Sequence, residues 1–486
     1  MLYYKEKIMY LLIILAIALL SLLCVIIVRA ICFRPPTTTN KTVSEEVFDK
    51  DGAINALAEL VRCKTVSRFD ENEEDDAEFE KLVSLLPSLY PNVFKNCTLT
   101  RTEGRGLLFK WQGKGEGKPA VLMAHYDVVP ADEDQWDKPP FEAIIEDGLM
   151  WGRGTLDTKV TVNAILFVAD HLISQGFVPE NDIYLAFSGG EEVNGPGAAN
   201  IVEYFKENGI EPSLVLDEGG AVVEKVFPGV SAPCALIGIA EKGILNLRYE
   251  VSSNGGHASA PKPHTPVGVL SRACMRVELS PFKSHITEPV AEMFDTLGRH
   301  SSFVYRIIFA NRWCFSPVLD AMAKRSGGEM NALLRTTVAF TQMSGSSAPN
   351  VIPTSASMVS NVRLNPEDSI ESATEYIRGV INDENVKVEV INGTEPSRIS
   401  TTDCDGWRKL VAAVEDTWQG AIVSPYLMVQ CSDSRHYGAI SDKVYRFSAM
   451  ALTSEERATI HGNNERVTLK GISQSVEFYI RFIKRL

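Results

Sequence analysis

The chain has 486 residues, of which 45% are hydrophobic and 23% charged. This composition is that of a globular protein, and it excludes a mainly disordered, collagen-like or coiled-coil architecture. The length predicts about two or three domains. The formal net charge of −14 argues against non-specific nucleic-acid binding, which depends on basic side chains that neutralise phosphates. Nine cysteines without a C-x-x-C pair are too few for a disulfide scaffold and exclude a zinc ribbon.

The N-terminal segment differs from the rest of the chain. Residues 8–28 are apolar apart from Ser21, and as a helix they are long enough to cross the roughly 30 Å hydrocarbon core of a membrane. This stretch exceeds the roughly 7–15 residues of a signal-peptide core, and no clean A-x-A cleavage site follows it. An uncleaved signal-anchor is therefore favoured over a cleaved signal peptide. We expect a short tail at 1–7, a transmembrane segment at 8–28 and an extended stalk at 29–44.

The compartment of the body follows from glycosylation motifs rather than from the flanking charges. Two lysines precede the apolar span and two arginines follow it, so the positive-inside comparison is nearly a tie. Three N-x-[ST] triplets lie downstream, at Asn40, Asn96 and Asn392, and they are useful acceptors only in the secretory pathway. The sequence therefore predicts a single-pass membrane glycoprotein with a lumenal or extracellular body, in a lysosome or vacuole or at the cell surface.

Three short apolar runs in the body each lead into a polar cluster. The runs and their clusters are 120–124 with His125 and Asp127, 183–187 with Glu191 and Glu192, and 214–216 with Asp217. Helix-like stretches separate the runs, and this strand–helix–strand alternation predicts an α/β fold with a doubly wound, mostly parallel sheet. Because ligands of such sheets bind outside the carboxyl ends of the strands, the three clusters are expected to meet.

The pattern changes near residue 245. A half-exposed strand, a long helical stretch and a second strand occupy residues 245–365, and the α/β alternation then resumes. This arrangement predicts that an α+β domain at 245–365 is inserted into an α/β domain formed by residues 45–244 and 366–486.

The polar clusters contain residue types that suit hydrolysis assisted by metal ions. His125 and Asp127 lie two residues apart at a strand end and so point to one side, where the aspartate can hold the other ring nitrogen of a histidine ligand. Asp157 follows a G-x-G-x-x-D pattern, which lacks the third glycine of a dinucleotide motif. With Glu192 and His461, these side chains are nitrogen and oxygen ligands suited to zinc. The sequence has neither a nucleophile elbow nor a P-loop, so metal-activated water is the remaining route to hydrolysis.

The order of the motifs resembles that of the M20 metallopeptidase family. The motifs are HYDVVP, GRGTLDTK, SGGEE, LDEGG and HGNNE, and the resemblance extends from about residue 45 to the end. Within the family, the chain is most similar to the N-fatty-acyl-amino acid synthase/hydrolase branch and next to carboxypeptidase S, through segments such as AEKGILNLRYEV, NRWCFSPVL and SDSRHY. The resemblance implies a di-zinc amidohydrolase whose inserted domain is a lid.

The resemblance also implies a role for each motif residue. The implied zinc ligands are His125 and Asp217 for one ion, Glu192 and His461 for the other, and Asp157 as the bridge between them. Asp127 would orient the histidine two residues before it, and Glu191 would act as general base. His257 matches the lid histidine that stabilises the developing oxyanion.

Four further residues match substrate-binding positions of the family. Arg363 would grip the free carboxylate of the substrate, for which an arginine fork is well suited. Asn350 would contact substrate or oxyanion, and Ser434 and Arg435 would line the pocket. The chain departs from the family pattern before the glutamate pair and around Cys431, which changes pocket walls but removes no ligand.

We therefore expect an enzyme that hydrolyses, and in the fatty-acyl branch also forms, the amide of an N-acyl amino acid. The alternative is a carboxypeptidase S-like exopeptidase that releases the C-terminal residue of a short peptide. An inactive, receptor-like protein is disfavoured, because every expected metal ligand and Glu191 are present. The apolar segments 303–309 and 313–319 would either line an alkyl channel or form the core of the lid. In the family the lid often also forms a homodimer.

Overall fold

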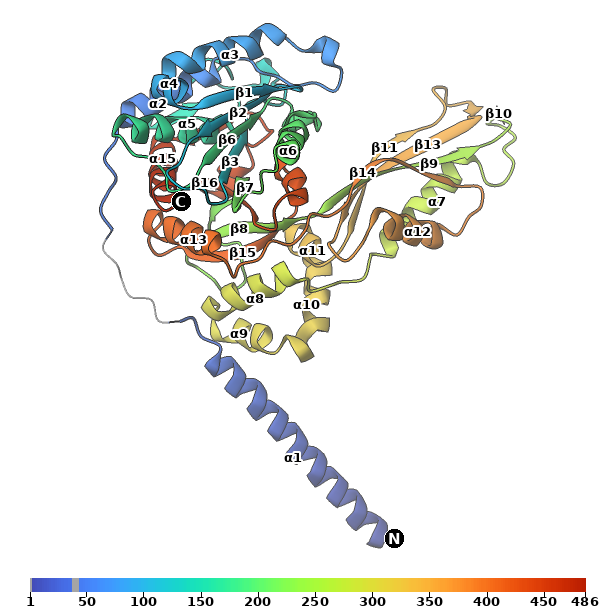
Figure 1. Cartoon of the computed structure of the whole chain (residues 1–486). Helices are drawn as coiled ribbons and strands as arrows, with labels where there is room; N and C mark the ends of the chain where they lie inside the picture. The colour runs from blue at the N-terminus through green and yellow to red at the C-terminus, as the bar shows by residue number, and fades with distance from the viewer. Residues whose placement is uncertain (1, 37–42) are drawn as a thin grey trace.

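The computed structural model describes residues 2–36 and 43–486, so the triplet at Asn40 lies outside the described residues. A core domain carries a lid on one side, and a single long helix projects from the body (Figure 1). Between this helix and the core domain lies a group of short helices that belongs to the inserted segment.

The core domain is built on an eight-stranded sheet with the order β1-β2-β6-β3-β7-β16-β8-β15. Its strands are β1 Thr98–Thr102, β2 Gly106–Trp111, β3 Ala120–His125, β6 Ile183–Ser188, β7 Leu214–Val223, β8 Cys234–Glu241, β15 Ile422–Met428 and β16 Val444–Leu452. Strand β3 runs parallel to both β6 and β7, and β16 runs parallel to β7. The three predicted strands therefore lie side by side and parallel, which confirms the expected α/β fold class. The sheet as a whole is mixed, because β2 pairs antiparallel with β1 and β6, and β16 pairs antiparallel with β8.

Helices cover both faces of this sheet. One face carries α2 Lys50–Val61, α3 Asp76–Leu89, α4 Pro91–Asn96, α5 Lys159–Ser174, α13 Asp405–Thr417 and α15 Leu469–Ile483, and the other carries α6 Gly197–Glu207. Along β3, Leu122 and Ala124 pack toward the first set of helices, whereas Val121 and Met123 pack toward α6. A strand buried on both faces reads as a continuous apolar run, which is why these strands were visible in the sequence.

Short elements complete the core domain. A three-stranded sheet joins β4 Ile144–Glu146, β5 Leu149–Trp151 and β17 Arg466–Thr468. Because β17 pairs with β5, the C-terminal segment lies beside the loop that follows β5. The four-residue helix α14 Ser454–Arg457 follows β16.

The lid contains an antiparallel sheet with the order β11-β13-β9-β14. Its elements are β9 Gly243–Ser252, α7 Pro266–Leu279, β11 Thr337–Ser344, β13 Ser355–Leu364, α12 Ile370–Ile381 and β14 Lys387–Thr394, and the strand pair β10 Gly256–His257 and β12 Val351–Ile352 forms its tip. The apolar side of this sheet packs against α7 and α12. The lid continues past the expected boundary at residue 365, because β14 completes its sheet beside β9.

Four helices of the inserted segment pack on the core domain. They are α8 Glu288–His300, α9 Phe303–Ala310, α10 Arg312–Ser326 and α11 Gly328–Leu334. Phe294 and Phe309 pack against Phe227, with ring centroids 5.8 and 4.7 Å apart, and α8 lies along β15. We call residues 288–334 the helical platform. The inserted segment is therefore a lid sheet and a separate helical unit, not one α+β unit.

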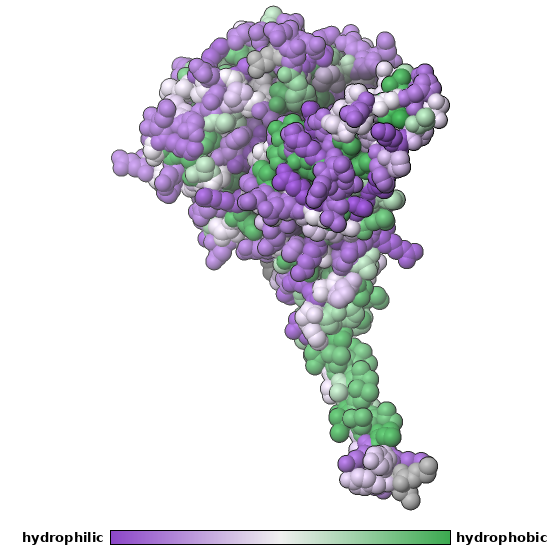
Figure 2. Space-filling view, turned by 90° about the vertical axis from the view of Figure 1, so that its right-hand side faces the viewer, coloured by the Kyte–Doolittle hydropathy of each residue, from purple (hydrophilic) through white to green (hydrophobic). Residues whose placement is uncertain are grey.

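The long helix α1, Leu2–Cys32, is apolar and exposed along its length, and it is long and apolar enough to span a membrane. Its C-terminal end contacts the helical platform. The Arg29 guanidinium donates to the carbonyl oxygen of Ala310 over 3.1 and 2.9 Å, and the Asn311 amide donates to the carbonyl oxygen of Ile26 over 3.1 Å. Figure 2 shows that the surface of α1 is mostly hydrophobic, whereas the surface of the body is largely hydrophilic.

Candidate active site and metal centre

The predicted polar clusters meet at the carboxyl ends of β3, β6 and β7. His125 is the last residue of β3, Glu191 and Glu192 lie in the turn after β6, and Glu218 lies within β7. Asp157 stands before α5, in the loop after β5. The parallel pairing of the three strands brings these separate clusters to one edge of the sheet, as the sequence predicted.

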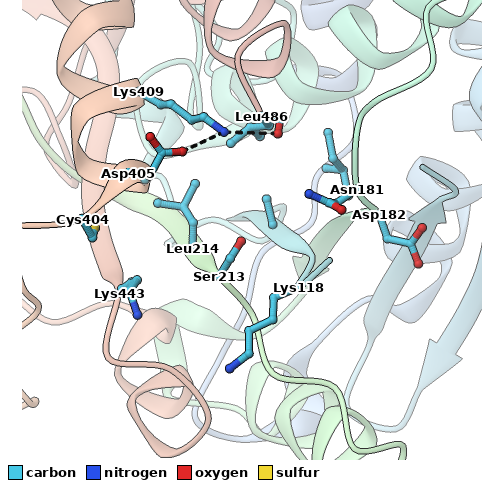
Figure 3. A pocket seen from close by; sticks show the side chains of 13 residues that line it. Lys118, Asn181, Asp182, Ser213, Leu214, Cys404, Asp405, Lys409, Lys443 and Leu486 are labelled. Atoms are coloured by element: carbon cyan, nitrogen blue, oxygen red, sulfur yellow. Dashed lines mark hydrogen bonds and ion pairs between the residues drawn. The ribbon is translucent and has the colours of Figure 1, made fainter. Parts of the chain in front are cut away.

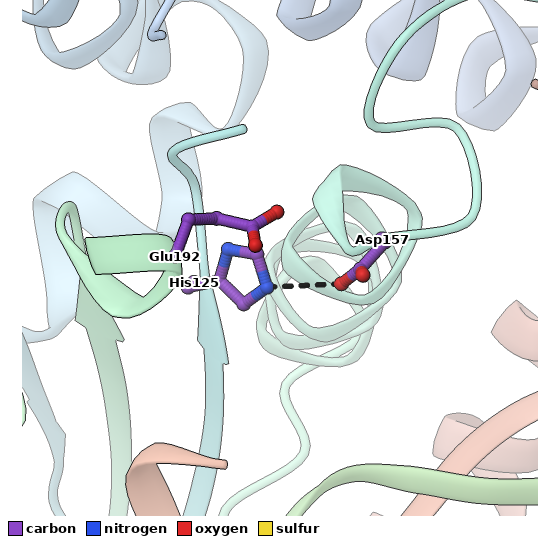
Figure 4. A group of neighbouring side chains, drawn as sticks. All are labelled: His125, Asp157 and Glu192. Atoms are coloured by element: carbon purple, nitrogen blue, oxygen red, sulfur yellow. Dashed lines mark hydrogen bonds and ion pairs between the residues drawn. The ribbon is translucent and has the colours of Figure 1, made fainter. Parts of the chain in front are cut away.

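Two histidines face the two oxygens of Asp157. The Nε2 atom of His125 lies 3.0 Å from Asp157 Oδ1, and the Nε2 atom of His461 lies 3.0 Å from Asp157 Oδ2. On the outer sides, His125 Nε2 is 3.1 Å from Glu218 Oε1, and His461 Nε2 is 3.1 Å from Glu192 Oε2. Asp157 thus lies between two groups, each with one histidine and one glutamate; His125, Asp157 and Glu192 are drawn in Figure 4.

Glu218, not Asp217, lies beside His125. The Asp217 carboxylate is buried on the other side of β7, where it accepts a hydrogen bond from the backbone N–H of Ser434 over 3.0 Å. Neighbouring residues of a strand point to opposite faces, so only one of the two carboxylates can join the cluster. The sequence predicts Asp217 as a ligand beside His125, but it is Glu218 that occupies this position.

Asp127 connects two of the clusters. Its carboxylate accepts hydrogen bonds from the backbone N–H groups of Glu191 and Glu192, over 3.1 and 3.2 Å. It also lies 3.4 Å from Nδ1 of His125 and accepts a hydrogen bond from the hydroxyl of Ser67. One fully buried carboxylate therefore orients the histidine of β3 and fixes the turn that carries the glutamate pair.

The loop that presents Asp157 is held by Glu465, which the sequence analysis did not single out. The Glu465 carboxylate is fully buried and accepts hydrogen bonds from the backbone N–H groups of Gly154, Leu156 and Asp157. It also pairs with the Arg153 guanidinium over 2.7 Å. Both residues lie inside recognised motifs, but only their contact shows that the HGNNE segment supports the bridging aspartate.

The charges of the cluster favour a bound cation. Burial raises the pKa of Glu218 to about 8. Burial, together with the charges of Asp433 and Glu218, raises the pKa of Glu191 well above its usual value. Hydrogen bonds to Asp157 and Glu192 raise the pKa of His461 to about 10. Carboxylates packed this closely in a dry site repel one another, and a cation relieves that repulsion.

The donor set also fits metal ions. Ligand atoms of His125, Asp157 and Glu192 lie within 4.8 Å of one another, and so do those of His125, Glu191 and Glu218. Among the described residues, Glu192 Oε1 is buried without a hydrogen-bond partner. A buried acceptor normally has one, so this oxygen is available to an ion. Imidazole and carboxylate donors of this kind suit zinc.

A cavity of about 430 Å³ opens from the cluster. The cluster residues Asp157, Glu191, Glu192, Glu218 and His461 line part of it. Its lining also includes apolar residues, which we call the apolar wall: Ala221, Val223, Leu236, Tyr426, Met428, Met450, Leu452 and Ile460. Polar side chains, among them Glu329, Gln430, Ser448 and Arg457, line the cavity as well. The imidazole of His461 is 53% exposed, whereas that of His125 is 2% exposed. The cluster is therefore open to a ligand on the side of His461, in a cavity that apolar side chains also line.

The lid residues lie apart from the cluster. His257 is exposed in β10, at the tip of the lid (Figure 1), and its ring nitrogen Nδ1 accepts hydrogen bonds from Ser259. Asn350 is exposed beside it and binds the N–H of Ala258 through its carbonyl oxygen. Neither residue lines the cavity of its own chain.

The other predicted substrate-binding residues, Arg363, Ser434 and Arg435, lie closer to the cavity than the lid residues do. The Arg363 guanidinium lies 3.6 Å from the sulfur of Cys431, which lines the cavity. The hydroxyl of Ser434 is buried against Ser432, and Arg435 donates to the carbonyl oxygen of Ser432 over 2.9 Å. Arg363 is thus positioned near the cavity, whereas Ser434 and Arg435 form its support.

A second cavity, of about 310 Å³, lies at the opposite, amino ends of β3, β6 and β7 (Figure 3). Its three lysines are each paired with a carboxylate: Lys118 with Glu211, Lys409 with Asp405 and Lys443 with Asp442. Each lysine that lines this cavity is therefore paired with a carboxylate.

Residues 121–485 match the model of the peptidase family M20/M25/M40. The chain belongs to this family. It is 35% identical over 480 residues to a probable carboxypeptidase S-like protein of Dictyostelium discoideum, covering 96% of this chain and 92% of that protein. It is 34% identical over 481 residues to an N-fatty-acyl-amino acid synthase/hydrolase of Xenopus tropicalis, covering 96% and 93%.

Solved structures agree with this assignment at the level of the fold. An M20 family metallo-carboxypeptidase from Sulfolobus solfataricus superposes with a TM-score of 0.64 at 17% identity, covering 89% of this chain and 98% of that chain. Human carnosine dipeptidase 1 superposes with a TM-score of 0.62 at 14% identity, covering 90% and 96%. The protein is an M20-type metallohydrolase, a family with amidohydrolase and carboxypeptidase activity.

We predict that Glu465→Gln destabilises the site and the fold together. An amide cannot balance the Arg153 charge or accept all the N–H groups that the carboxylate accepts, and breaking a buried ion pair costs about 3–5 kcal/mol. The melting temperature should fall by about 3–5 °C in circular dichroism, because the unfolding entropy of a chain of this length is roughly 1 kcal/mol/K. The exposed Glu455→Gln is the matched control and should leave it unchanged. An unaltered melting temperature in Glu465→Gln would show that this carboxylate does not support the loop.

Proposed function

We propose that this protein is a membrane-anchored di-zinc amidohydrolase that cleaves the amide bond of N-fatty-acyl amino acids, and that can also form this bond. The observation that carries the proposal is the cavity that joins the histidine–carboxylate cluster to an apolar wall. A carboxylate-rich end suits amide hydrolysis, and the apolar wall suits an alkyl chain. The similarity to the N-fatty-acyl-amino acid synthase/hydrolase of Xenopus tropicalis over almost the whole chain supports it.

His125 and Glu218 would hold one zinc ion, His461 and Glu192 the other, and Asp157 would bridge them. Glu218 takes the place that the sequence analysis assigned to Asp217, because it is the carboxylate that faces His125. Bound zinc lowers the pKa of a coordinated water and polarises a carbonyl group. Metal identity and number are therefore the first quantities to measure.

The chain's own residues would carry the proton transfers. Glu191 lines the cavity and is held by the hydrogen bond from its N–H to Asp127. Its carboxylate would take a proton from the attacking water and deliver it to the leaving amine. Arg363 would bind the free carboxylate of the amino acid through its guanidinium. The acyl chain would then extend along the apolar wall.

The N-terminal helix would anchor the enzyme with its body in the lumen or outside the cell. Two of the three glycosylation triplets can be located, and both are at the surface: Asn96 and Asn392 are exposed. Surface exposure is what an acceptor for N-glycans requires.

We predict that Glu191→Gln abolishes turnover without loss of metal. General base catalysis contributes about 10²- to 10⁴-fold, so kcat for N-oleoyl-phenylalanine should fall by at least about a hundredfold. Metal analysis should still find two zinc ions per chain. Removing the metal from wild type with a chelator should abolish activity, and zinc should restore it. Full activity in Glu191→Gln would refute the assigned base.

We predict that the apolar wall sets the preference for acyl length. Ala221→Phe narrows the cavity, so kcat/KM for N-oleoyl-phenylalanine should fall by about tenfold or more, while N-butyryl-phenylalanine is turned over as before. Ala451→Phe is the matched control, since Ala451 is exposed between two wall residues of β16. A wild-type preference for a blocked dipeptide over both acyl substrates would instead support the carboxypeptidase S-like alternative.

We propose that two copies pair through their lids. His257 and Asn350 lie exposed at the lid tip, away from the cluster of their own chain. Strands β11 and β14 are the two edges of the lid sheet, and an open edge is a natural surface for pairing with a second copy. A partner's lid tip would supply these residues to the cavity.

Mixing two inactive variants tests this pairing. If His257 acts in the site of the partner, a dimer of Glu191→Gln with His257→Ala contains one complete site. Random mixing should then restore about a quarter of wild-type activity, because half the dimers are mixed and each has one working site of two. An equal mixture that stays as inactive as its components would place His257 in the site of its own chain, whereas a fully active His257→Ala variant would place His257 outside catalysis.

A further inference from the structure

We propose that the outer side of α9 and α10 lies in the membrane interface beside α1, as a second membrane contact that places the acyl-binding cavity close to the bilayer. We call the exposed apolar residues at the starts of these two helices the interfacial face: Phe303, Val304 and Trp313. Met322 is also exposed, but it follows Trp313 by nine residues and so lies on the opposite side of α10. The inference rests on the proposed membrane anchor and concerns a different part of the molecule.

The first observation is the level at which α1 meets the helical platform. The apolar span ends at Val28, and the Asn311 amide donates to the carbonyl oxygen of Ile26, two residues earlier. At 1.5 Å per residue, this contact lies about 3 Å inside the end of the span. Arg29, one residue beyond the span, donates to Ala310. The turn between α9 and α10 therefore lies at the boundary of the hydrocarbon core whenever α1 spans a membrane.

The second observation is the character of the side chains at this level. Val304 is 67% exposed and Trp313 is 59% exposed, and exposed apolar side chains of this size are a common feature of interaction surfaces. Tryptophan is enriched where hydrocarbon meets head groups, because its ring has an apolar body and a polar edge. The same face is therefore poorly suited to water and well suited to the membrane interface.

The third observation is charge. Between residues 299 and 327 the chain has five basic residues and one acidic residue, in a protein whose net charge is −14. Lys324 and Arg325 are exposed at the end of α10. Basic side chains beside an apolar, tryptophan-containing face are the composition of helices that lie in the membrane plane. Lys324 already pairs with Asp320 over 3.0 Å, and Arg299 with Asp295 over 2.8 Å, so lipid phosphates would complement Arg325 in particular.

The platform also leads to the cavity. Glu329 of α11 lines the cavity and accepts a hydrogen bond from the Tyr426 hydroxyl over 2.7 Å. Helix α11 follows α10 directly, so the helical platform that would contact the bilayer through α9 and α10 borders the cavity through α11. An acyl amino acid dissolved in the membrane would then reach the site over a short path, with little exposure of its alkyl chain to water.

Fluorescence quenching by lipid tests the contact directly. The full chain is reconstituted into bilayers of phosphatidylcholine with bromine atoms near the glycerol end of the acyl chains. We expect these lipids to quench the tryptophan emission of wild type, and Trp313→Phe to lose at least half of the quenching. Trp407→Phe, which removes a half-buried tryptophan of the core domain, should keep it. Equal quenching in wild type and Trp313→Phe would overturn the proposal.

A functional experiment tests whether the interfacial face helps a membrane-dissolved substrate to reach the cavity. Val304→Glu places a charge on the interfacial face, and Ile145→Glu places one on an equally non-catalytic, exposed site of the core domain. In Val304→Glu, turnover of N-oleoyl-phenylalanine in vesicles should fall about tenfold, because a charge opposes interfacial burial, while turnover of soluble N-butyryl-phenylalanine stays unchanged. Ile145→Glu should alter neither. Equal loss on both substrates, or no loss on either, would contradict the inference.

Together, the quenching experiment and the turnover experiment distinguish a failure of this inference from a failure of the proposed function. If wild type hydrolyses no acyl amino acid at all, the proposed substrate is wrong, yet lipid quenching of Trp313 still decides whether the interfacial face contacts the bilayer. If the enzyme is active but Trp313 is not quenched and cross-links instead to a second chain, the face is a protein interface and the membrane contact is refuted.

Discussion

The site depends on one buried carboxylate, that of Asp127. It stands after β3, accepts the two N–H groups of the glutamate turn after β6 and lies beside the ring of His125. Ionised carboxylates are costly to bury unless hydrogen bonds satisfy them, and here donors from the backbone and from Ser67 do so. The pKa of Asp127, which burial alone would raise, is lowered by His125 and by these donors. A charge that is stable in the interior can then hold two other charged groups at fixed positions.

The remaining carboxylates of the site repel one another, and this repulsion lowers the stability of the folded protein. Glu191, Glu192 and Glu218 lie close to Asp157, and burial raises the pKa of all three glutamates. This repulsion opposes folding, and cations bound by the same groups would oppose the repulsion in turn. The support lies outside the cluster, in hydrogen bonds such as those of Glu465 to the loop of Asp157. Rigid support of this kind is what fixed ligand geometry requires.

Much of this arrangement could be predicted from the sequence, since strands β3, β6 and β7 are continuous apolar runs and a parallel sheet brings their carboxyl ends together. The choice between Asp217 and Glu218 could not, because adjacent strand residues point to opposite faces and both are carboxylates. The extent of the lid was missed because β14 pairs with β9 across more than a hundred residues. The helical platform was missed for a related reason: an amphipathic helix such as α8 shows which side is buried, not that β15 is what covers it.

Because the inserted segment consists of a lid sheet and a separate helical platform, it can serve both purposes that we propose: pairing with a second copy and positioning the core domain at the membrane. Its lid sheet touches the core domain little and carries exposed residues at its tip, so it is free to meet a second copy. Its helices pack on β15 and on the end of α1, so with the proposed membrane anchor they would fix the height of the core domain above the membrane. A substrate with an alkyl chain partitions into the bilayer, because burying each methylene is worth about 0.8 kcal/mol. An enzyme acting on it would gain from a cavity held near that surface. If α1 is the membrane anchor that we propose, the contacts of Arg29 and Asn311 between α1 and the helical platform would set the position of the core domain relative to the bilayer.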